Sequence, residues 1–199
     1  MQGTCVPMSL VIAFIGAQSA VMAGDMREII TRGDEASTET LEQELYTGQI
    51  VTDDALKKRA EALGISLIIR DDKRKVTVRD GILVGEVSET EGNVSKKRRL
   101  YATGGEYAIA EITDADLRLT TKGKASNFVV LGNEVTKQIA HACIQENWKN
   151  GGVRDAIRIL ILSLERASGA TASVSSLYTL IQTPQKGSLL AILEQDSRQ

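Results

Sequence analysis

Two short apolar runs lie near the start of the chain, with a polar turn between them. Residues 9–15 and 20–25 are almost entirely apolar, whereas Gly16, Gln18 and Ser19 separate them. A short continuous apolar run bounded by turn residues is typical of a buried strand. We therefore predict a β-hairpin that returns Asp25, at its end, to the level of Ser9, at its beginning.

The rest of the chain alternates between helical and extended patterns. Capping residues precede two of the expected helices, Thr52 and Asn133, and a Thr40/Gln43 spacing is typical of a capping box. Apolar residues recur with helical spacing after Gly151-Gly152, which predicts an antiparallel pair of helices. We expect helices over residues 40–46, 54–63, 134–148 and 153–164, and further strands over 65–70, 75–79, 82–88, 100–103, 107–112, 127–131, 173–182 and 188–194.

A charged stretch over residues 34–98 interrupts the apolar pattern. Its expected helices and strands, with a hairpin signal at Asp80-Gly81, predict an inserted α+β subdomain. Two interpretations stay open for this insertion: a surface decoration without function, or a unit that grips a substrate.

Composition and charge exclude several classes of protein. The chain has 24 basic and 26 acidic residues and 42% hydrophobic content, which predicts one globular domain without affinity for nucleic acid. Cys5 and Cys143 are too few for a disulfide framework or a zinc site. The only histidine, His141, falls off the apolar stripe of its helix, so a Ser/His/Asp triad is not expected. We predict a cytoplasmic protein without metal or cofactor.

Residues 1–24 also have features of a secretory signal peptide, because an apolar stretch leads to small residues. Residues 1–8 contain no Lys or Arg, however, so the positive region of such a peptide is missing. The stretch is also too short and too interrupted to span a bilayer. We interpret residues 1–8 as a leader or a misassigned start, and residues 9–199 as a single domain with its insertion.

Removal of everything up to Met8 would give Ser9 a free α-amine. The unperturbed pKa of an α-amine is about 7.7 to 8.0, so near neutral pH it can accept the proton of the serine hydroxyl. One residue would then supply both the nucleophile and the base.

The hairpin from Ser9 to Asp25, with Met26-Arg27-Glu28 after it, resembles the opening of proteasome β subunits and other N-terminal-nucleophile (Ntn) hydrolases. Within that group it is most similar to connectases, protein ligases of methanogenic archaea. A second match is Glu165-Arg166-Ala167-Ser168-Gly169, at the end of a helix. The resemblance covers about residues 9–33 and 96–193, and it implies an α+β fold, the four-layer αββα sandwich.

The resemblance also implies roles for individual residues. Ser9 would be the nucleophile and Asp25 its acidic neighbour, while Glu165 and Ser168 would hold the terminal amine. Gly132 and Asn133 stand where the family places backbone donors of the oxyanion hole. The family has a lysine before an apolar strand, and here Arg99 precedes Leu100; Lys97 or Arg98 replaces Arg99 if the register slips.

By this resemblance the chain is a sequence-specific protein ligase that exchanges peptide segments through a serine acyl-enzyme. The implied substrate carries a Lys-Asp-Pro-Gly-Ala motif in a methyltransferase subunit. Two alternatives stay open: a proteasome-like endopeptidase assembled into rings, and a non-catalytic scaffold in which Ser9 lies in mid-chain. Connectases continue into a small C-terminal domain, so we expect a shorter relative or part of a longer protein.

Overall fold

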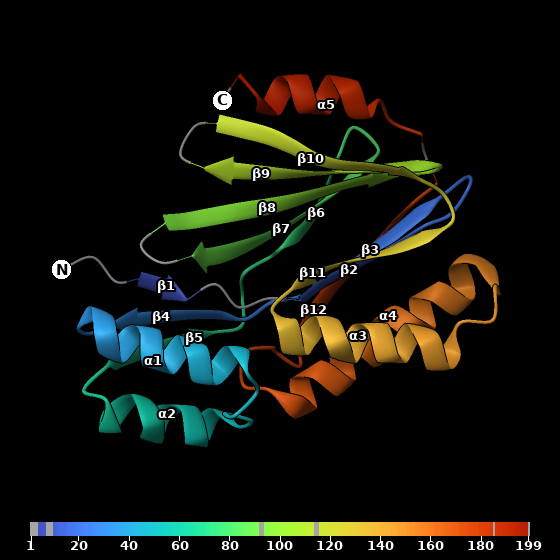
Figure 1. Cartoon of the computed structure of the whole chain (residues 1–199). Helices are drawn as coiled ribbons and strands as arrows, with labels where there is room; N and C mark the ends of the chain where they lie inside the picture. The colour runs from blue at the N-terminus through green and yellow to red at the C-terminus, as the bar shows by residue number, and fades with distance from the viewer. Residues whose placement is uncertain (1–3, 7–9, 92–93, 114–115, 185, 199) are drawn as a thin grey trace.

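The structure, a computed structural model, describes residues 4–6, 10–91, 94–113, 116–184 and 186–198. Within these ranges the chain has a mixed α+β fold of five helices and three sheets (Figure 1). Ser9, the residue predicted to act as the nucleophile, lies outside the described residues.

The predicted hairpin forms the centre of a four-stranded antiparallel sheet. Strands β2 (Leu10–Ile15) and β3 (Ala20–Asp25) pair with each other, and every residue in both is buried. Strands β11 (Asn127–Gly132) and β12 (Tyr178–Thr183) complete the order β11-β2-β3-β12. Continuous apolar sequence suits β2 and β3 because both faces of this sheet are covered. The prediction of this hairpin is confirmed.

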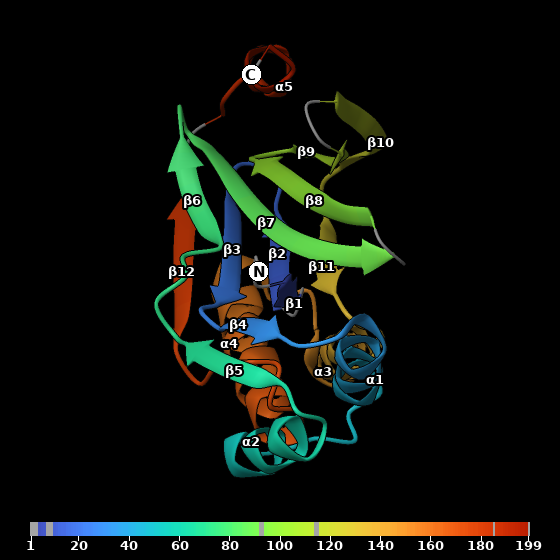
Figure 2. The same cartoon turned by 90° about the vertical axis from the view of Figure 1, so that its left-hand side faces the viewer.

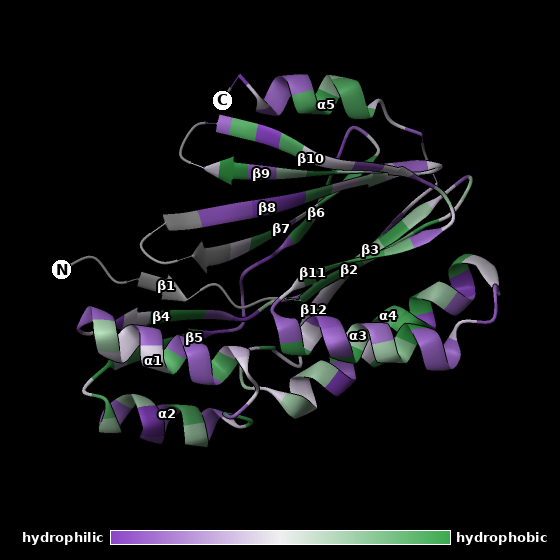
Figure 3. Ribbon diagram, viewed as in Figure 1, coloured by the Kyte–Doolittle hydropathy of each residue, from purple (hydrophilic) through white to green (hydrophobic). Residues whose placement is uncertain are grey.

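Two antiparallel helices, α3 (Glu134–Asn147) and α4 (Gly152–Ala170), cover one face of this sheet. Asn133 caps α3 as predicted, since its Oδ1 accepts a hydrogen bond from Thr136 N at 2.9 Å. Both helices are banded in hydropathy, as expected for one apolar and one polar face (Figure 3). Among the described residues, no helix combines the length and apolar character needed to cross a membrane.

The other face of the hairpin sheet packs against a five-stranded antiparallel sheet of order β10-β9-β8-β7-β6. Its strands are β6 (Val76–Arg79), β7 (Ile82–Glu91), β8 (Val94–Thr103), β9 (Glu106–Thr113) and β10 (Asp116–Lys124). A Cβ atom at Gly85 would lie 2.6 Å from Met22 Sδ and 2.7 Å from Val11 Cγ1. Glycine at this position therefore allows the two sheets to approach closely.

The outer face of the five-stranded sheet is covered by helix α5 (Leu189–Asp196). The predicted strand over residues 188–194 is therefore wrong. Leu189, Ile192 and Leu193 recur with helical spacing and are buried, and Ser188 Oγ caps the helix by accepting from Ala191 N at 3.3 Å. The strand expected over 173–182 is likewise shorter, because β12 begins only at Tyr178.

A third, small sheet of order β1-β4-β5 lies at the end of the molecule opposite α5 (Figure 2). It consists of β1 (Thr4–Val6), β4 (Glu28–Arg32) and β5 (Ser66–Arg70), and helices α1 (Glu35–Tyr46) and α2 (Asp53–Ala62) pack on it around Leu41, Leu45 and Leu56. We call β4, α1, α2 and β5 the small unit.

The small unit differs in extent from the predicted insertion over residues 34–98. Strands β6 and β7 and the first part of β8 fall within that range but belong to the large five-stranded sheet. Helix α1 also begins earlier than predicted, at Glu35, because Asp34 Oδ1 caps it by accepting from Ser37 N at 2.9 Å. Thr40 lies inside the helix and donates its hydroxyl to Ala36 O.

Candidate active site

Asp25 is the centre of the candidate site. It ends strand β3, its residue is 0% exposed, and two backbone N–H groups hold its carboxylate. Leu10 N donates to Oδ1 at 2.8 Å, and Arg27 N donates to Oδ2 at 2.8 Å. The hairpin register produces the first contact, because Val11 pairs with Gly24 and the start of β2 therefore lies level with the end of β3. The carboxylate is thus fixed in one orientation.

Lys75 forms a buried ion pair with this carboxylate. Its Nζ lies 2.8 Å from Asp25 Oδ1 and 2.7 Å from Oδ2, and its side chain is only 3% exposed. The backbone of Lys75 is anchored to the large sheet, since Glu86 N donates to Lys75 O at 2.9 Å. Burying a lysine is costly unless its charge is paired, so the environment of Lys75 depends on Asp25.

The backbone at the start of β2 contacts this pair. Leu10, whose N–H contacts Asp25, directly follows Ser9 in the sequence. The Lys75–Asp25 pair therefore lies at the start of β2, in contact with the residue that follows Ser9 in the sequence.

Three buried hydroxyl residues follow helix α4: Thr171, Ser173 and Ser175. Thr171 Oγ1 donates to Ser173 Oγ at 2.9 Å, and Ser175 N approaches Asp25 Oδ2 at 3.5 Å. Ser175 Oγ accepts from Leu177 N at 2.9 Å, which fixes the turn into β12. This connection therefore lines the Asp25 side of the site with polar groups.

Gly132 and Asn133 lie near the start of β2 and the connection after α4. Gly132 pairs with Leu10 at the edge of β2, and Asn133 begins helix α3. Asn133 Nδ2 reaches Ser173 Oγ at 3.4 Å, so the start of α3 and the connection after α4 meet here. Backbone N–H groups at a helix start are available to an anion.

Arg99, in contrast, lies away from Asp25, and its expected role must be corrected. Its guanidinium donates to Glu86 Oε2 at 2.9 Å and to Asp196 Oδ2 at 2.7 Å. Successive side chains of a strand point to opposite faces. Leu100 on β8 faces the core between the two sheets, so Arg99 faces α5 instead. The cation that pairs with Asp25 is Lys75.

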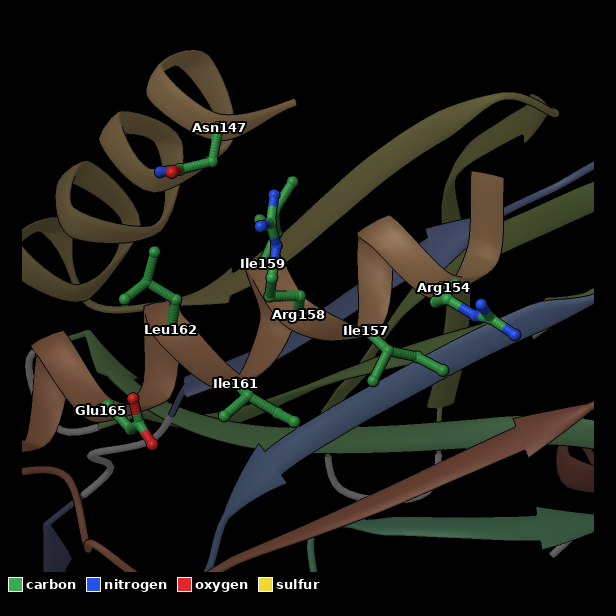
Figure 4. Close-up of a pocket in the computed structure, with 8 residues that line it drawn as sticks. All are labelled: Asn147, Arg154, Ile157, Arg158, Ile159, Ile161, Leu162 and Glu165. Atoms are coloured by element: carbon green, nitrogen blue, oxygen red, sulfur yellow. The ribbon is translucent and has the colours of Figure 1, made fainter. Parts of the chain in front are cut away.

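Glu165 and Ser168 also lie apart from Asp25. Helix α4 continues to Ala170, so both residues are inside the helix rather than at its end. Ser168 Oγ donates to Glu165 O at 2.9 Å, and Glu165 lines an open pocket with Arg158 and Ile161 on the outer side of α4 (Figure 4). The residues of this corner that reach the Asp25 region are Ser173 and Ser175.

Lys75 was not predicted from the sequence as a residue of this candidate site. Lys75 begins a predicted strand, but it also ends the charged run Asp71-Asp72-Lys73-Arg74-Lys75, which is typical of a solvated segment. A usable signal was present, because Lys75 directly precedes the apolar Val76 at a strand start, which is where the Ntn pattern expects a lysine.

Comparison with known proteins identifies the family. The sequence matches the family described as "Connectase MJ0548-like, N-terminal domain" over residues 8–198. Among solved structures, it is similar to eukaryotic HslV from Trypanosoma brucei, with 12% identity and a TM-score of 0.38 over 87% of this chain and 98% of that chain. No curated protein sequence matches significantly. The family match spans nearly the whole sequence and confirms the resemblance noted above, so the chain belongs to the connectase family.

Proposed function

We propose that the protein is a sequence-specific protein ligase that works through an acyl-enzyme on Ser9. The observation that carries the proposal is the buried Lys75–Asp25 pair, which contacts the N–H of the residue after Ser9. The connectase family supports a ligase, and the layers α3/α4, hairpin sheet, five-stranded sheet and α5 support the four-layer αββα sandwich of Ntn hydrolases.

In this mechanism the α-amine of a freed Ser9 takes the proton from its own hydroxyl. The serine oxygen attacks a backbone carbonyl carbon of the substrate, and the leaving amine takes up the proton as the peptide bond breaks. Lys75 supplies a fixed positive charge, and Asp25 holds that ammonium in place. Backbone N–H groups near Gly132 and Asn133 would stabilise the oxyanion.

The resulting ester lies within reach of the serine amine, so the acyl group can shift from oxygen to nitrogen. Reversal of these steps by an incoming amine gives a new peptide bond, whereas water gives hydrolysis. A ligase requires that the amine be favoured. By the family resemblance, we propose a cytoplasmic enzyme of a methanogenic archaeon whose substrate carries Lys-Asp-Pro-Gly-Ala in a methyltransferase subunit.

This proposal requires a free amine on Ser9, and therefore removal of residues 1–8. The test uses protein that begins at Ser9, the matched protein that retains residues 1–8, and a peptide containing Lys-Asp-Pro-Gly-Ala. Intact mass spectrometry should show an adduct of one acyl segment only on the first protein, and a second amine-bearing peptide should remove that segment. Free hydrolysed peptide without an adduct would support the endopeptidase, and no reaction would support the scaffold.

A further inference from the structure

Arg27 joins three segments that are distant in the sequence. It lies between β3 and β4, its side chain is 7% exposed, and its guanidinium contacts Asp53, Asp71 and the carbonyl of Ala172. These groups come from the start of α2, the segment after β5 and the connection after α4. Nε donates to Asp71 Oδ1 at 2.8 Å, and Nη1 donates to Ala172 O at 2.9 Å.

All the hydrogen-bonding capacity of Arg27 is used in this arrangement. A guanidinium has five N–H donors in a fixed plane, and the remaining donors bind Asp53 Oδ1, Asp53 Oδ2 at 3.3 Å and Asp71 Oδ2 at 3.0 Å. Burial alone would lower the pKa of Arg27, but its hydrogen bonds to Asp71 and Asp53 raise that pKa on balance. Arg27 is therefore a permanent charge held in one position.

Arg27 is also connected to the candidate active site. Its backbone N–H donates to Asp25 Oδ2, the atom that Lys75 approaches to 2.7 Å. Its hydrogen bond lowers the pKa of Asp71, and the Ser175 hydroxyl and the charge of Lys75 lower that pKa further. A displacement of the guanidinium would therefore change the surroundings of the Asp25 and Asp71 carboxylates and of the connection that contains Ser175.

The start of helix α2 is stabilised by groups other than Asp53. Thr52 already caps the helix, because its Oγ1 accepts from Ala55 N at 3.2 Å. Asp54 places a second carboxylate in the same first turn, where negative charge interacts favourably with the helix dipole. The two aspartates differ in that Asp53 binds both Nη atoms of Arg27.

We propose that Asp53 is a positioning residue for the acyl-transfer reaction, a role that rests on the function proposed above. Through Arg27, Asp53 ties helix α2 of the small unit to the Lys75–Asp25 pair and to the connection after α4. The small unit is then part of the catalytic framework and not only a surface decoration. Asp53 itself touches neither the substrate nor the reacting atoms in this mechanism.

The test compares Asp53→Asn with Asp54→Asn in protein that begins at Ser9. The first variant should slow adduct formation at saturating peptide about tenfold, because small displacements of reacting groups are costly. The second should stay within twofold of wild type, and Asp53→Glu, which retains the carboxylate, should recover most of the rate. The peptide concentration at half-maximal rate should not change.

A readout that does not depend on activity separates positioning from instability. Asp53→Asn should unfold at a somewhat lower temperature than Asp54→Asn, because only Asp53 pairs with Arg27, so the rates of both variants are measured at a temperature at which both remain folded. The ¹³Cε resonance of Lys75 should move in Asp53→Asn but not in Asp54→Asn. Equal rates and equal Lys75 signals in the two variants would refute the role of Asp53, whereas an inactive wild type would refute the proposed function itself.

Discussion

Lys75 Nζ lies 2.7 Å from Asp25 Oδ2 in a region from which water is almost completely excluded. Removing two charges from water costs several kcal/mol, and an apolar pair of similar size is often at least as stable. The ion pair is therefore not expected to stabilise the fold more than an apolar pair would. A fixed positive charge beside the start of β2 does suit an enzyme that must stabilise negative charge on a serine or on an oxyanion.

Replacement of Lys75 by methionine should slow adduct formation about a hundredfold to a thousandfold, the usual effect of losing one electrostatic contact to a transition state. Protein that begins at Ser9 would be assayed by intact mass spectrometry. Lys73→Met is the matched control, because Lys73 pairs with Glu28 through a side chain that is 42% exposed. Equal rates for the two variants would contradict a role for Lys75.

The same substitution leaves Asp25 buried without its cation, which should lower the free energy of unfolding by about 3 to 5 kcal/mol. The double variant Lys75→Met/Asp25→Asn should recover a large part of this loss, because it removes the unpaired charge as well. Urea denaturation of the wild type, the single and the double variant measures both changes. A double variant less stable than Lys75→Met would show that the pair does stabilise the fold.

Local signals account for the parts of the structure that the sequence predicted well. These signals act over only a few positions, so they can be recognised from the sequence alone: the apolar runs of β2 and β3, and the capping residues Thr52 of α2 and Asn133 of α3. The Asp25–Lys75 contact joins residues 50 positions apart and follows from the packing of two sheets. In the sequence, Lys75 therefore has the features of a solvated charged run. The run Lys96-Lys97-Arg98-Arg99 precedes an apolar strand and led to the prediction of Arg99 instead.

The strand predicted in place of helix α5 was wrong for a different reason. Apolar residues at 189, 190, 192 and 193 fit either a short strand or a helix, and periodicity over so few positions does not separate them. The decisive contact is again distant, since Asp196 accepts hydrogen bonds from Arg79, Arg99 and Tyr101 on the large sheet.

The cluster of Asp196 with Arg79, Arg99 and Tyr101 makes the stability of the fold depend on pH. Burial alone would raise the pKa of Asp196, but hydrogen bonds from Arg79, Tyr101 and Arg99 lower it to about 2. The ordinary pKa of aspartate in an unfolded chain is about 3.9. The stabilisation, on the order of 2 kcal/mol, is thus fully present above about pH 5 and is lost as the pH falls towards 2.

Asp196→Asn should therefore be less stable than wild type at pH 7, and the difference should shrink progressively below pH 4. Denaturant unfolding at a series of pH values measures it. Glu194→Gln, an exposed change on the same helix, should have little effect at any pH. A difference between wild type and Asp196→Asn that is constant from pH 7 to pH 2 would rule out this origin of the acid sensitivity.

His141 should be dispensable for the reaction. It is exposed on α3, and the proposed mechanism uses the Ser9 amine and not an imidazole as the base. His141→Ala should keep the rate of adduct formation within a few-fold of wild type. A thousandfold loss would mean that the α-amine is not the base.

The chemical state of the adduct distinguishes the steps of the proposed ligation. An acyl group still on the Ser9 oxygen is an ester, which hydroxylamine cleaves, whereas an acyl group that has moved to the nitrogen is an amide and survives. We expect a hydroxylamine-resistant adduct on protein that begins at Ser9, and transfer of that acyl group when a second amine-bearing peptide is added.

Ser9→Ala should give no adduct at all. Asp25→Asn should slow its formation strongly, because Lys75 loses the charge that holds it. Adduct that disappears into hydrolysed peptide even with excess amine present would refute the ligase and leave the endopeptidase.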